Sequence, residues 1–177
     1  LGLVDDLKIN FNPKIRLALM IIFLIVLIKY NNFYLDKTGI TILNSWIENS
    51  EIFFLIFISL CFLFVINGAN LIDGYNGLLG LHSLIIIINL FLINYVNENS
   101  DLAFLLFLVL LVLINFLIFN FPKAKIFLGD GGAYLLGAFI AASAIKTSIA
   151  NPAISPFYFC ILLFYLFFEV FFSFFRK

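Results

Sequence analysis

The chain contains few charged residues, few cysteines and few prolines. Only 11% of its 177 residues are charged and 64% are hydrophobic, whereas a soluble domain is about a quarter charged and about half apolar. A soluble single-core domain is therefore excluded, as are disorder and a collagen repeat. The two cysteines, Cys61 and Cys160, lie inside apolar runs, which excludes a disulfide scaffold. Lys+Arg and Asp+Glu are equal at 10 each, so charge does not indicate a nucleic-acid partner and none is expected.

Long hydrophobic runs make up most of the sequence. A bilayer core of about 30 Å is crossed by about 20 apolar residues in a helix. Lipid offers the backbone no hydrogen-bond partner, so each run should be helical. A transmembrane barrel would show short strands of alternating polarity, and the sequence has no such alternation. We therefore predict an all-α, polytopic transmembrane bundle that forms one membrane domain over residues 1–177. The predicted spans are 15–30, 52–67, 78–96, 102–120, 133–150 and 156–175.

Six spans would place the connecting segments on alternate sides of the membrane. Segments 1–14, 67–77, 121–132 and 176–177 fall on one side, and 31–51, 97–101 and 151–155 fall on the other. The first side carries Lys8, Lys14, Arg16, Lys123, Lys125, Arg176 and Lys177, and the other carries Lys29, Lys37 and Lys146. Basic residues accumulate on the cytoplasmic side, so the first side is predicted to be cytoplasmic. A miscounted span would change this assignment.

Three segments on the predicted cytoplasmic side carry unusual polarity. They are the stretch around Asp5-Asp6, the stretch from Asn67 to Leu78 with Asp73, and the stretch from Asn120 to Ala133 with Asp130. The last two aspartates stand among apolar residues at the ends of spans. An ionisable group costs about 2.5–3.5 kcal/mol at the centre of a membrane span, so such residues are functional candidates.

Carboxylates gathered at one membrane face repel each other, and a hard cation would relieve this repulsion. Mg²⁺ prefers one or two carboxylates together with substrate phosphates and water. Glycines in the same segments let backbone N–H groups approach a phosphate, and Lys123 and Lys125 add positive charge. The pattern therefore indicates a diphosphate bound through Mg²⁺. The amides that could contact a sugar or a base are Asn67, Asn70, Asn76 and Asn120.

Each segment taken alone also has a structural interpretation. Asp5-Asp6 is typical of a solvated interfacial pair, and Asp73-Gly74 and Gly129-Asp130-Gly131-Gly132 are typical of turns between helices. Lys123 and Lys125 would then serve only to orient the loop in the membrane. The occurrence of all three acidic segments on one predicted face favours a site.

Two further ionisable residues lie inside predicted spans. His82 has no Cys or acid at ligand spacing, so we expect it to pack between helices rather than bind metal. Glu169 lies in the last span and could reach the membrane interface near Arg176. Neither residue is assigned to the site.

The three segments, in this order and spacing, resemble those of the polyprenyl-phosphate N-acetylhexosamine-1-phosphate transferases. That superfamily includes the phospho-MurNAc-pentapeptide translocase and the bacterial enzymes that start O-antigen, enterobacterial common antigen and teichoic acid synthesis. The matching stretches are Val4-Asp5-Asp6, Asn70-Leu71-Ile72-Asp73-Gly74-Tyr75-Asn76-Gly77-Leu78 and Phe127-Leu128-Gly129-Asp130-Gly131-Gly132, with a weaker match from Phe168-Glu169 to Arg176-Lys177. The resemblance spans nearly the whole chain, and the combination is more specific than any one stretch.

The resemblance implies a ten-helix enzyme of the bacterial inner membrane with its active site in cytoplasmic loops. Such an enzyme transfers a sugar-1-phosphate from a UDP-N-acetylhexosamine to undecaprenyl phosphate and releases UMP. The implied metal is Mg²⁺, with Mn²⁺ as the alternative, and homodimers occur in the family. The family also has an earlier basic loop and a later His-x-His loop that this sequence does not contain. We therefore expect the chain to be incomplete at both ends and to represent roughly helices four to nine.

Catalytic roles transfer from the family by position. Asp130 matches the Mg²⁺-binding aspartate of the glycine-flanked loop. Asp5 and Asp6 match the paired aspartates, the first of which is often proposed as the base that deprotonates the lipid phosphate. Asp73 and Asn70 match the aspartate and asparagine of the second loop, near the nucleotide.

Binding roles transfer in the same way. Asn120 and Phe127 align with residues of the uridine pocket, where Phe127 can stack on uracil. Lys123 and Lys125 are expected to contact the diphosphate because of their positive charge, apart from the resemblance. Many members have a second aspartate where this chain has Asn76, so an indispensable base is not expected at that position. The muramyl-pentapeptide branch is disfavoured because its characteristic loop surroundings are not reproduced.

Other classes of protein remain open at this point. A transporter would carry its acids near the bilayer midplane in broken helices, whereas these acids cluster at one predicted face. A phosphotransferase of the CDP-alcohol type would have acids spaced by three residues along paired helices, which this chain lacks. An inactive fragment with a structural role is the remaining alternative.

Overall fold

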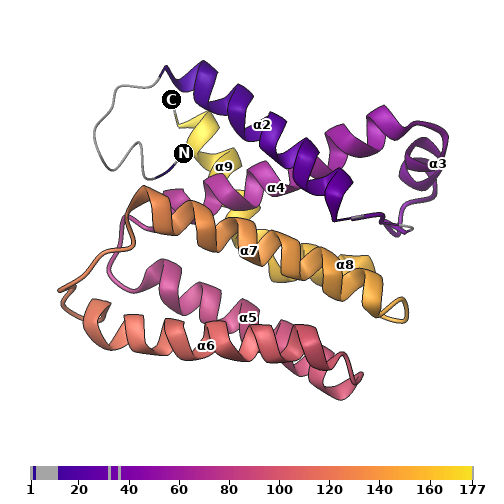
Figure 1. Cartoon of the computed structure of the whole chain (residues 1–177). Helices are drawn as coiled ribbons and strands as arrows, with labels where there is room; N and C mark the ends of the chain where they lie inside the picture. Colours follow the sequence, from indigo (N-terminus) through magenta and orange to yellow (C-terminus); the bar gives the residue numbers. More distant parts are fainter. Residues whose placement is uncertain (1, 3–11, 32, 36, 177) are drawn as a thin grey trace.

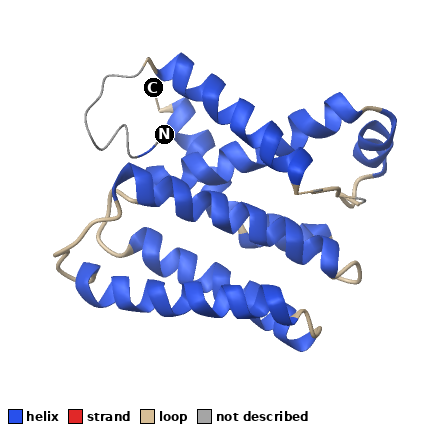
Figure 2. Ribbon diagram, in the orientation of Figure 1, coloured by secondary structure: helices blue, strands red, loops and turns tan. Residues whose placement is uncertain are grey.

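The computed structural model describes residues 2, 12–31, 33–35 and 37–176, and its regular structure is helical (Figures 1 and 2). In chain order the helices are α2 (Pro13–Tyr30), α3 (Thr41–Asn49), α4 (Glu51–Ile72), α5 (Leu78–Val96), α6 (Ser100–Asn120), α7 (Gly129–Ala150), α8 (Pro156–Leu162) and α9 (Phe164–Phe175). No strand occurs in this described part of the chain. The predicted all-α fold class is confirmed.

Helix α4 occupies the centre of the bundle, where it packs against α2, α7 and α9. Its Phe62 is completely buried. Two glycines let the backbones approach closely. A Cβ on Gly68 would collide with the carbonyl oxygen of Leu166 in α9, and a Cβ on Gly137 would lie 2.8 Å from the Cα of Ile66 in α4. Small residues at such crossings are the usual means by which membrane helices pack.

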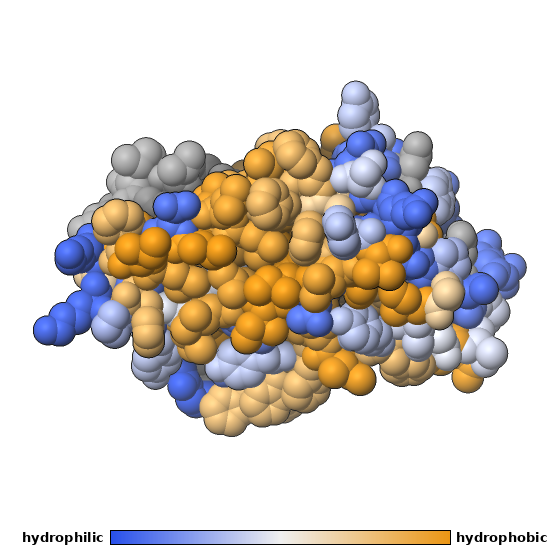
Figure 3. Space-filling view, turned by 90° about the horizontal axis from the view of Figure 1, so that it is seen from below, coloured by the Kyte–Doolittle hydropathy of each residue, from blue (hydrophilic) through white to orange (hydrophobic). Residues whose placement is uncertain are grey.

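Helices α5 and α6 form a hairpin at the edge of the bundle, and α5 also contacts α7. The outer surface of α6 exposes large apolar side chains such as Phe104, Val112 and Ile118. Seen from below, the molecule shows a broad apolar region between more hydrophilic ends (Figure 3). This distribution suits helices that cross a membrane, because the apolar side chains face lipid.

Four helices of the described chain, α4, α5, α6 and α7, are long and apolar enough to cross a membrane. The pair α8 and α9 adds a fifth candidate if the two helices, inclined to each other by 58°, count as one span. This is fewer than the six spans predicted from the sequence. The missing one is α2, whose 18 residues include Lys14, Arg16 and Lys29. Charged side chains are expensive in hydrocarbon, so α2 does not qualify.

The end of α4 and the start of α7 differ from the predicted span limits, and both lie next to the candidate site. Helix α4 continues to Ile72 instead of ending at 67, and α7 begins at Gly129 instead of 133. Asn67 lies within α4, where its amide Nδ2 donates to the carbonyl of Leu63 one turn earlier, over 2.7 Å. As a result, Asn70 lies in the last turn of α4 rather than in a loop, and Asp130 lies in the first turn of α7.

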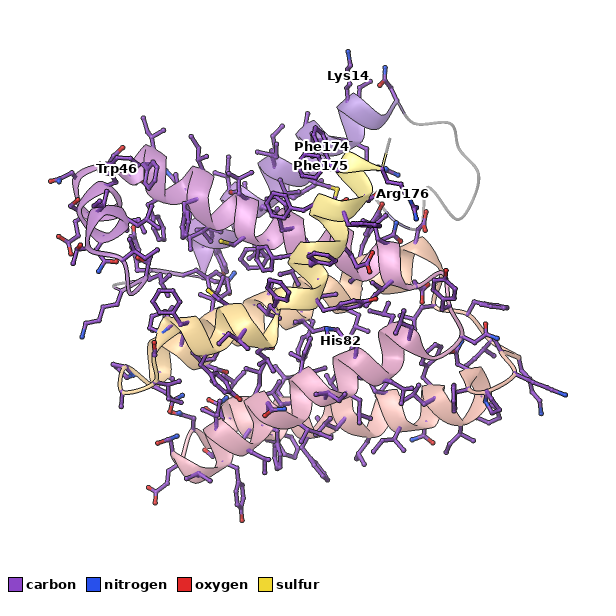
Figure 4. The ribbon with its side chains drawn as sticks, turned by 180° about the vertical axis from the view of Figure 1, so that it is seen from behind. Lys14, Trp46, His82, Phe174, Phe175 and Arg176 are labelled. Atoms are coloured by element: carbon purple, nitrogen blue, oxygen red, sulfur yellow. The ribbon has the colours of Figure 1, made fainter. Side chains whose placement is uncertain are left out.

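The short helix α3 between α2 and α4 was not predicted. Ser50 then begins α4, because its hydroxyl accepts a hydrogen bond of 3.2 Å from the N–H of Phe53. Trp46 of α3 packs edge-on against Phe53, with ring centroids 5.5 Å apart. Trp46 lies at the opposite end of the molecule from Lys14 and Arg176 (Figure 4). An exposed Trp at this end is typical of a membrane interface.

Candidate functional site

The turn between α4 and α5 and the segment between α6 and α7 meet at one end of the bundle (Figure 1). The buried side chain of Asn120 joins them. Its Oδ1 accepts a hydrogen bond of 2.6 Å from the N–H of Gly77, and its Nδ2 donates to the carbonyl of Ile126 over 2.7 Å. Asn76 adds a longer hydrogen bond from its Nδ2 to the carbonyl of Pro122, over 3.4 Å.

Glycine at position 77 is required by the backbone. Gly77 precedes α5 with a φ of 77°, in the left-handed region that residues with a Cβ rarely adopt. A Cβ there would also lie 2.7 Å from the ring of Phe121. The turn can therefore approach the 121–128 segment closely only because residue 77 has no side chain.

Asp73 caps the end of α4 and is half-buried. Burial, and then the negative charge of Asp130, raise the pKa of the Asp73 carboxyl from 3.8 to about 6. Asp73 at the end of α4 and Asp130 in the first turn of α7 therefore lie near enough for the charge of Asp130 to act on the Asp73 carboxyl. The structure therefore brings together two of the acidic residues that the sequence analysis selected.

Asp130 stands in the first turn of α7, where the helix dipole stabilises a negative charge. Gly129 before it has a φ of 67°. The residue Gly2 lies against the same place, because a Cβ on Gly2 would be 2.7 Å from the carbonyl oxygen of Asp130. The paired aspartates Asp5 and Asp6 lie outside the described residues.

Asn70 reaches toward the start of α7. Its Nδ2 donates to the hydroxyl of the buried Tyr134 over 3.4 Å. The guanidinium of Arg16, from α2, lies 6.0 Å from the centre of the Tyr134 ring. The sequence analysis missed Tyr134. Tyr134 follows Asp130 by four residues and so shares a helix face with it. This spacing is informative only when α7 begins at Gly129, and the predicted span began at 133.

The remaining selected residues lie on the segment between α6 and α7 or next to it. The side chains of Lys123, Lys125 and Asn76 are exposed. Phe127 is 73% exposed, so its ring is available to a ligand. Asn120 differs from these, because both polar groups of its side chain are already used to hold the segments together.

The described residues contain no group of three His, Cys, Asp or Glu side chains that could hold a metal ion. The described residues therefore do not form a complete set of protein ligands for a metal ion. The pair Asp73 and Asp130 has the donor chemistry that suits Mg²⁺, which commonly takes one or two carboxylates and completes its shell with phosphate and water. The donor set thus fits a metal that binds together with a phosphate substrate.

His82 packs between helices, as expected. Its ring lies edge-on to that of Tyr165, with centroids 5.2 Å apart, and the contact joins α5 to α9 (Figure 4). Its Nε2 is buried and has no hydrogen-bond partner in the structure. The described part of the chain places no metal-binding group around it.

Together these features define a polytopic helical membrane protein with a polar, acidic site at one end of the bundle. The profile of the family described as "Glycosyl transferase family 4" matches residues 1–148. The chain belongs to this family. The resemblance to the polyprenyl-phosphate hexosamine-1-phosphate transferases, which form the same superfamily, is thereby confirmed.

Several curated bacterial proteins are similar to the chain. The Phospho-N-acetylmuramoyl-pentapeptide-transferase of Dictyoglomus turgidum is 34% identical over 157 residues, which is 84% of this chain and 49% of that protein. The proteins of the same name from Lactococcus lactis and Listeria monocytogenes are 34% identical over 110 residues and 31% identical over 154 residues. These matches cover 62% and 82% of this chain, and 33% and 47% of those proteins. The chain thus spans about half the length of the curated relatives it matches most fully. No solved structure matches it.

Proposed function

We propose that the protein transfers a sugar-1-phosphate, with an N-acetylhexosamine as the sugar, from a UDP-sugar to undecaprenyl phosphate and releases UMP. The reaction would take place at the cytoplasmic face of a bacterial plasma membrane and would start the synthesis of a cell-envelope glycan. The proposal is carried by the position of Asp73 at the end of α4 and of Asp130 at the start of α7, where the charge of Asp130 acts on the Asp73 carboxyl. Membership of Glycosyl transferase family 4 supports it.

The proposed reaction exchanges one phosphoanhydride for another. An oxygen of the lipid phosphate bonds to the phosphorus that carries the sugar, and the bond from that phosphorus to the bridging oxygen of the diphosphate breaks. The electron pair leaves with UMP. Because attacking and leaving groups are both anionic, the protein must chiefly position them and stabilise negative charge.

Asp130 and Asp73 would hold the Mg²⁺, or alternatively Mn²⁺, that neutralises the diphosphate. Asp130 is suited to this because it stands at the start of α7 beside the carboxyl of Asp73. Asp5 and Asp6 are proposed to act on the lipid phosphate, the first as general base. The match of Val4-Asp5-Asp6 to the paired aspartates of the family supports this proposal. An aspartate that attacks as nucleophile in a two-step route is the alternative mechanism.

Exposed side chains near Asp73 and Asp130 could contact the uracil, the diphosphate and the sugar of a UDP-sugar. Phe127 offers a ring on which uracil can stack, and Lys123 and Lys125 offer positive charge to the diphosphate. Asn70 and Asn76 are proposed to contact the nucleotide or the sugar. For Asn120 we propose an indirect contribution to the uridine pocket, because its hydrogen bonds position the segment that carries Phe127.

A second donor is favoured by the names of the relatives. The similar proteins from Dictyoglomus, Lactococcus and Listeria are all named Phospho-N-acetylmuramoyl-pentapeptide-transferase. UDP-MurNAc-pentapeptide is therefore the alternative donor, although the sequence analysis disfavoured that branch. The two donors share the same diphosphate and uridine and differ only in the sugar and its peptide.

A transporter is disfavoured by the position of the acids. Asp73 and Asp130 lie at the ends of α4 and α7, whereas transporter sites lie near the bilayer midplane. A structural role without activity remains the main alternative to an enzyme. It predicts the same fold but no turnover.

A UMP exchange assay tests the proposal. The whole protein in membranes is given labelled UMP, undecaprenyl phosphate, Mg²⁺ and one unlabelled donor at a time, namely UDP-GlcNAc, UDP-GalNAc or UDP-MurNAc-pentapeptide. Undecaprenyl diphosphate sugar formed from the donor reacts back with labelled UMP, so label should enter one UDP-sugar. EDTA should abolish the exchange. Label in the pentapeptide donor alone would favour the second candidate, and no exchange with any donor would contradict both.

A further inference from the structure

A polar cavity lies at the end of the bundle opposite to the acidic residues Asp73 and Asp130. It measures about 510 Å³ and is formed where the end of α2, the turn between α5 and α6 and the end of α7 meet. Small-molecule sites commonly measure roughly 300–1,000 Å³. The cavity is therefore large enough for a ligand, and it is remote from the proposed transferase site.

The cavity is lined by charges of both signs. Lys146 of α7 lies on one side, and Glu98 and Asp101 of the α5–α6 turn lie on the other. Among the described residues, no ion pair joins Lys146 to either acid, whereas Lys29 pairs with Glu51 at 3.1 Å. The Lys146 ammonium instead lies 5.6 Å from the centre of the Phe33 ring. A cation and two anions thus face one cavity without neutralising each other directly.

The position of the cavity narrows the choice of ligand. Glu98 and Asp101 follow α5 and begin α6, and Lys146 lies in the last turns of α7. All three helices are long enough to span a membrane, so their ends lie at the level of lipid head groups. Phe33, Leu102 and Ile149 add apolar surface to the same cavity. A ligand with a charged head and an apolar body would match both kinds of lining.

Buried asparagine side chains form hydrogen bonds beside the cavity. Asn94 of α5 is completely buried and donates from Nδ2 to the Thr147 hydroxyl of α7 over 2.8 Å. Asn151 is also buried and donates to the carbonyl of Thr147 over 2.8 Å. The Asn94 hydrogen bond, together with a longer one of 3.5 Å from Asn99 Nδ2 to Asn151 Oδ1, joins the end of α7 to the end of α5 and to the turn that follows it. The backbone positions that carry the three charged side chains are thus fixed relative to one another.

We infer that this cavity binds the head group of a zwitterionic phospholipid with a primary ammonium, of the phosphatidylethanolamine class. Lys146 contacts the phosphodiester, and the start of α6 adds backbone N–H groups to it. Glu98 and Asp101 accept hydrogen bonds from the ammonium. The apolar lining takes the glycerol and the first carbons of the acyl chains.

Lipid retention tests this inference directly. The whole protein is reconstituted into bilayer nanodiscs of phosphatidylcholine alone, phosphatidylcholine with phosphatidylethanolamine, or phosphatidylcholine with phosphatidylglycerol. It is then released into detergent, and the lipids that remain bound are counted by native mass spectrometry. Phosphatidylcholine has the same phosphate but no N–H on its ammonium, and phosphatidylglycerol has the phosphate without an ammonium. Retention of phosphatidylethanolamine should exceed that of phosphatidylglycerol by about fivefold, the ratio expected from one additional interfacial charge contact. It should also exceed that of phosphatidylcholine, whose ammonium keeps the charge but cannot donate hydrogen bonds to the carboxylates.

Charge variants locate the bound lipid. The double variant Glu98→Gln with Asp101→Asn should abolish the preference for phosphatidylethanolamine. Lys146→Ala should instead lower the retention of all three lipids, because all three carry the phosphate that Lys146 contacts, and Lys146→Arg should retain them. Lys37→Ala and Glu48→Gln remove exposed charges outside this cavity and serve as matched controls. All of these side chains are exposed, and the melting temperature in detergent verifies that each variant is folded.

Three results would overturn the inference. Equal retention of phosphatidylethanolamine and phosphatidylcholine would show that the N–H groups of the ammonium are not recognised. Retention of phosphatidylglycerol at the same level, or displacement of the lipid by inorganic phosphate, would show a simple phosphate site. A preference that survives in the double variant Glu98→Gln with Asp101→Asn, or unchanged lipid retention by Lys146→Ala, would place the bound lipid elsewhere on the protein.

Discussion

The Asn120 side chain accepts a hydrogen bond of 2.6 Å from the backbone N–H of Gly77 and so attaches the end of α6 to the start of α5. Its other end donates to the carbonyl of Ile126, on the segment that carries Phe127. One buried amide therefore determines how the turn after Asp73 and the segment before Asp130 lie against each other. The geometry of the proposed site depends on this residue even though its polar groups face the protein.

Replacement of Asn120 should therefore destabilise the site more than replacement of a similar residue on the same helix. Asn120→Ala leaves a buried N–H and a carbonyl unpaired, which should lower the free energy of unfolding by about 1–3 kcal/mol. Asn115→Ala is the control, because the exposed Asn115 only donates to Leu111 within α6. Melting temperatures in detergent measure both variants. An equal effect of the two substitutions would contradict the role assigned to Asn120.

Glycines of the α4–α5 turn should differ in their tolerance of a side chain. Gly77→Ala places a Cβ at a positive φ and against the Phe121 ring, and the left-handed conformation alone should cost about 1–2 kcal/mol. Gly74→Ala should have little effect, because the nearest atom to its Cβ would be the Leu71 carbonyl oxygen at 4.0 Å. Thermal unfolding of the two variants compares them. A Gly77→Ala protein as stable as Gly74→Ala would show that the turn differs from the structure.

Glycines in the helix interfaces should differ for another reason. Gly68→Ala pushes a Cβ against the backbone of α9 at Leu166, and such overpacking should cost about 1–3 kcal/mol. Gly80→Ala meets the end of the flexible Leu117 side chain at 2.7 Å, which can move aside, so a smaller loss is expected. Unfolding of both proteins in the same detergent provides the comparison. The packing of α4 on α9 would be in doubt if Gly80→Ala proved the more harmful change.

Phe127 should contribute to nucleotide binding without contributing to stability. Stacking of a base on an aromatic ring is worth about 1–3 kcal/mol, so Phe127→Ala should raise KM for the UDP-sugar by roughly 5- to 150-fold. Phe104→Ala is the control, because Phe104 is similarly exposed but lies on α6 away from the loops. Steady-state kinetics measure KM, and the melting temperature of Phe127→Ala should be unchanged. An unchanged KM would remove Phe127 from the uridine pocket.

The sequence predicted the helices better than their ends. The expected span 78–96 coincides with α5, because it is a long apolar run that follows a clear glycine turn. The expected end of α4 at 67 was wrong because Asn67 was interpreted as polar and therefore as part of a loop. In the structure its amide bonds to the helix itself, as the amides of Asn89, Asn94, Asn97 and Asn115 also do. The same bond also occurs where helices end, at Asn31, Asn97 and Asn151, so an asparagine alone does not determine where a helix ends.

Other features could not be predicted from local sequence. The bend between α8 and α9 falls at Leu163, which is neither proline nor glycine and has neither as a neighbour. The close passage of α9 over Gly68 of α4 accompanies this bend, and such a contact depends on residues far apart in the chain. The hydrogen bond from Asn70 to Tyr134 is also a tertiary feature, because it requires α4 and α7 to be neighbours. The acidic residues, in contrast, could be selected because charge at the end of an apolar span is costly wherever it lies.

The most direct test of the transferase proposal is UMP exchange by Asp130→Asn compared with the unaltered protein. Glu51→Gln is the matched control, because Glu51 also stands in the first turn of a helix but at the opposite end, in an exposed ion pair with Lys29. Loss of the metal ligand should lower the exchange rate by about a hundredfold or more, as for other groups that stabilise transition-state charge. Glu51→Gln should retain normal exchange. Near-normal exchange by a folded Asp130→Asn protein would contradict the account of the site.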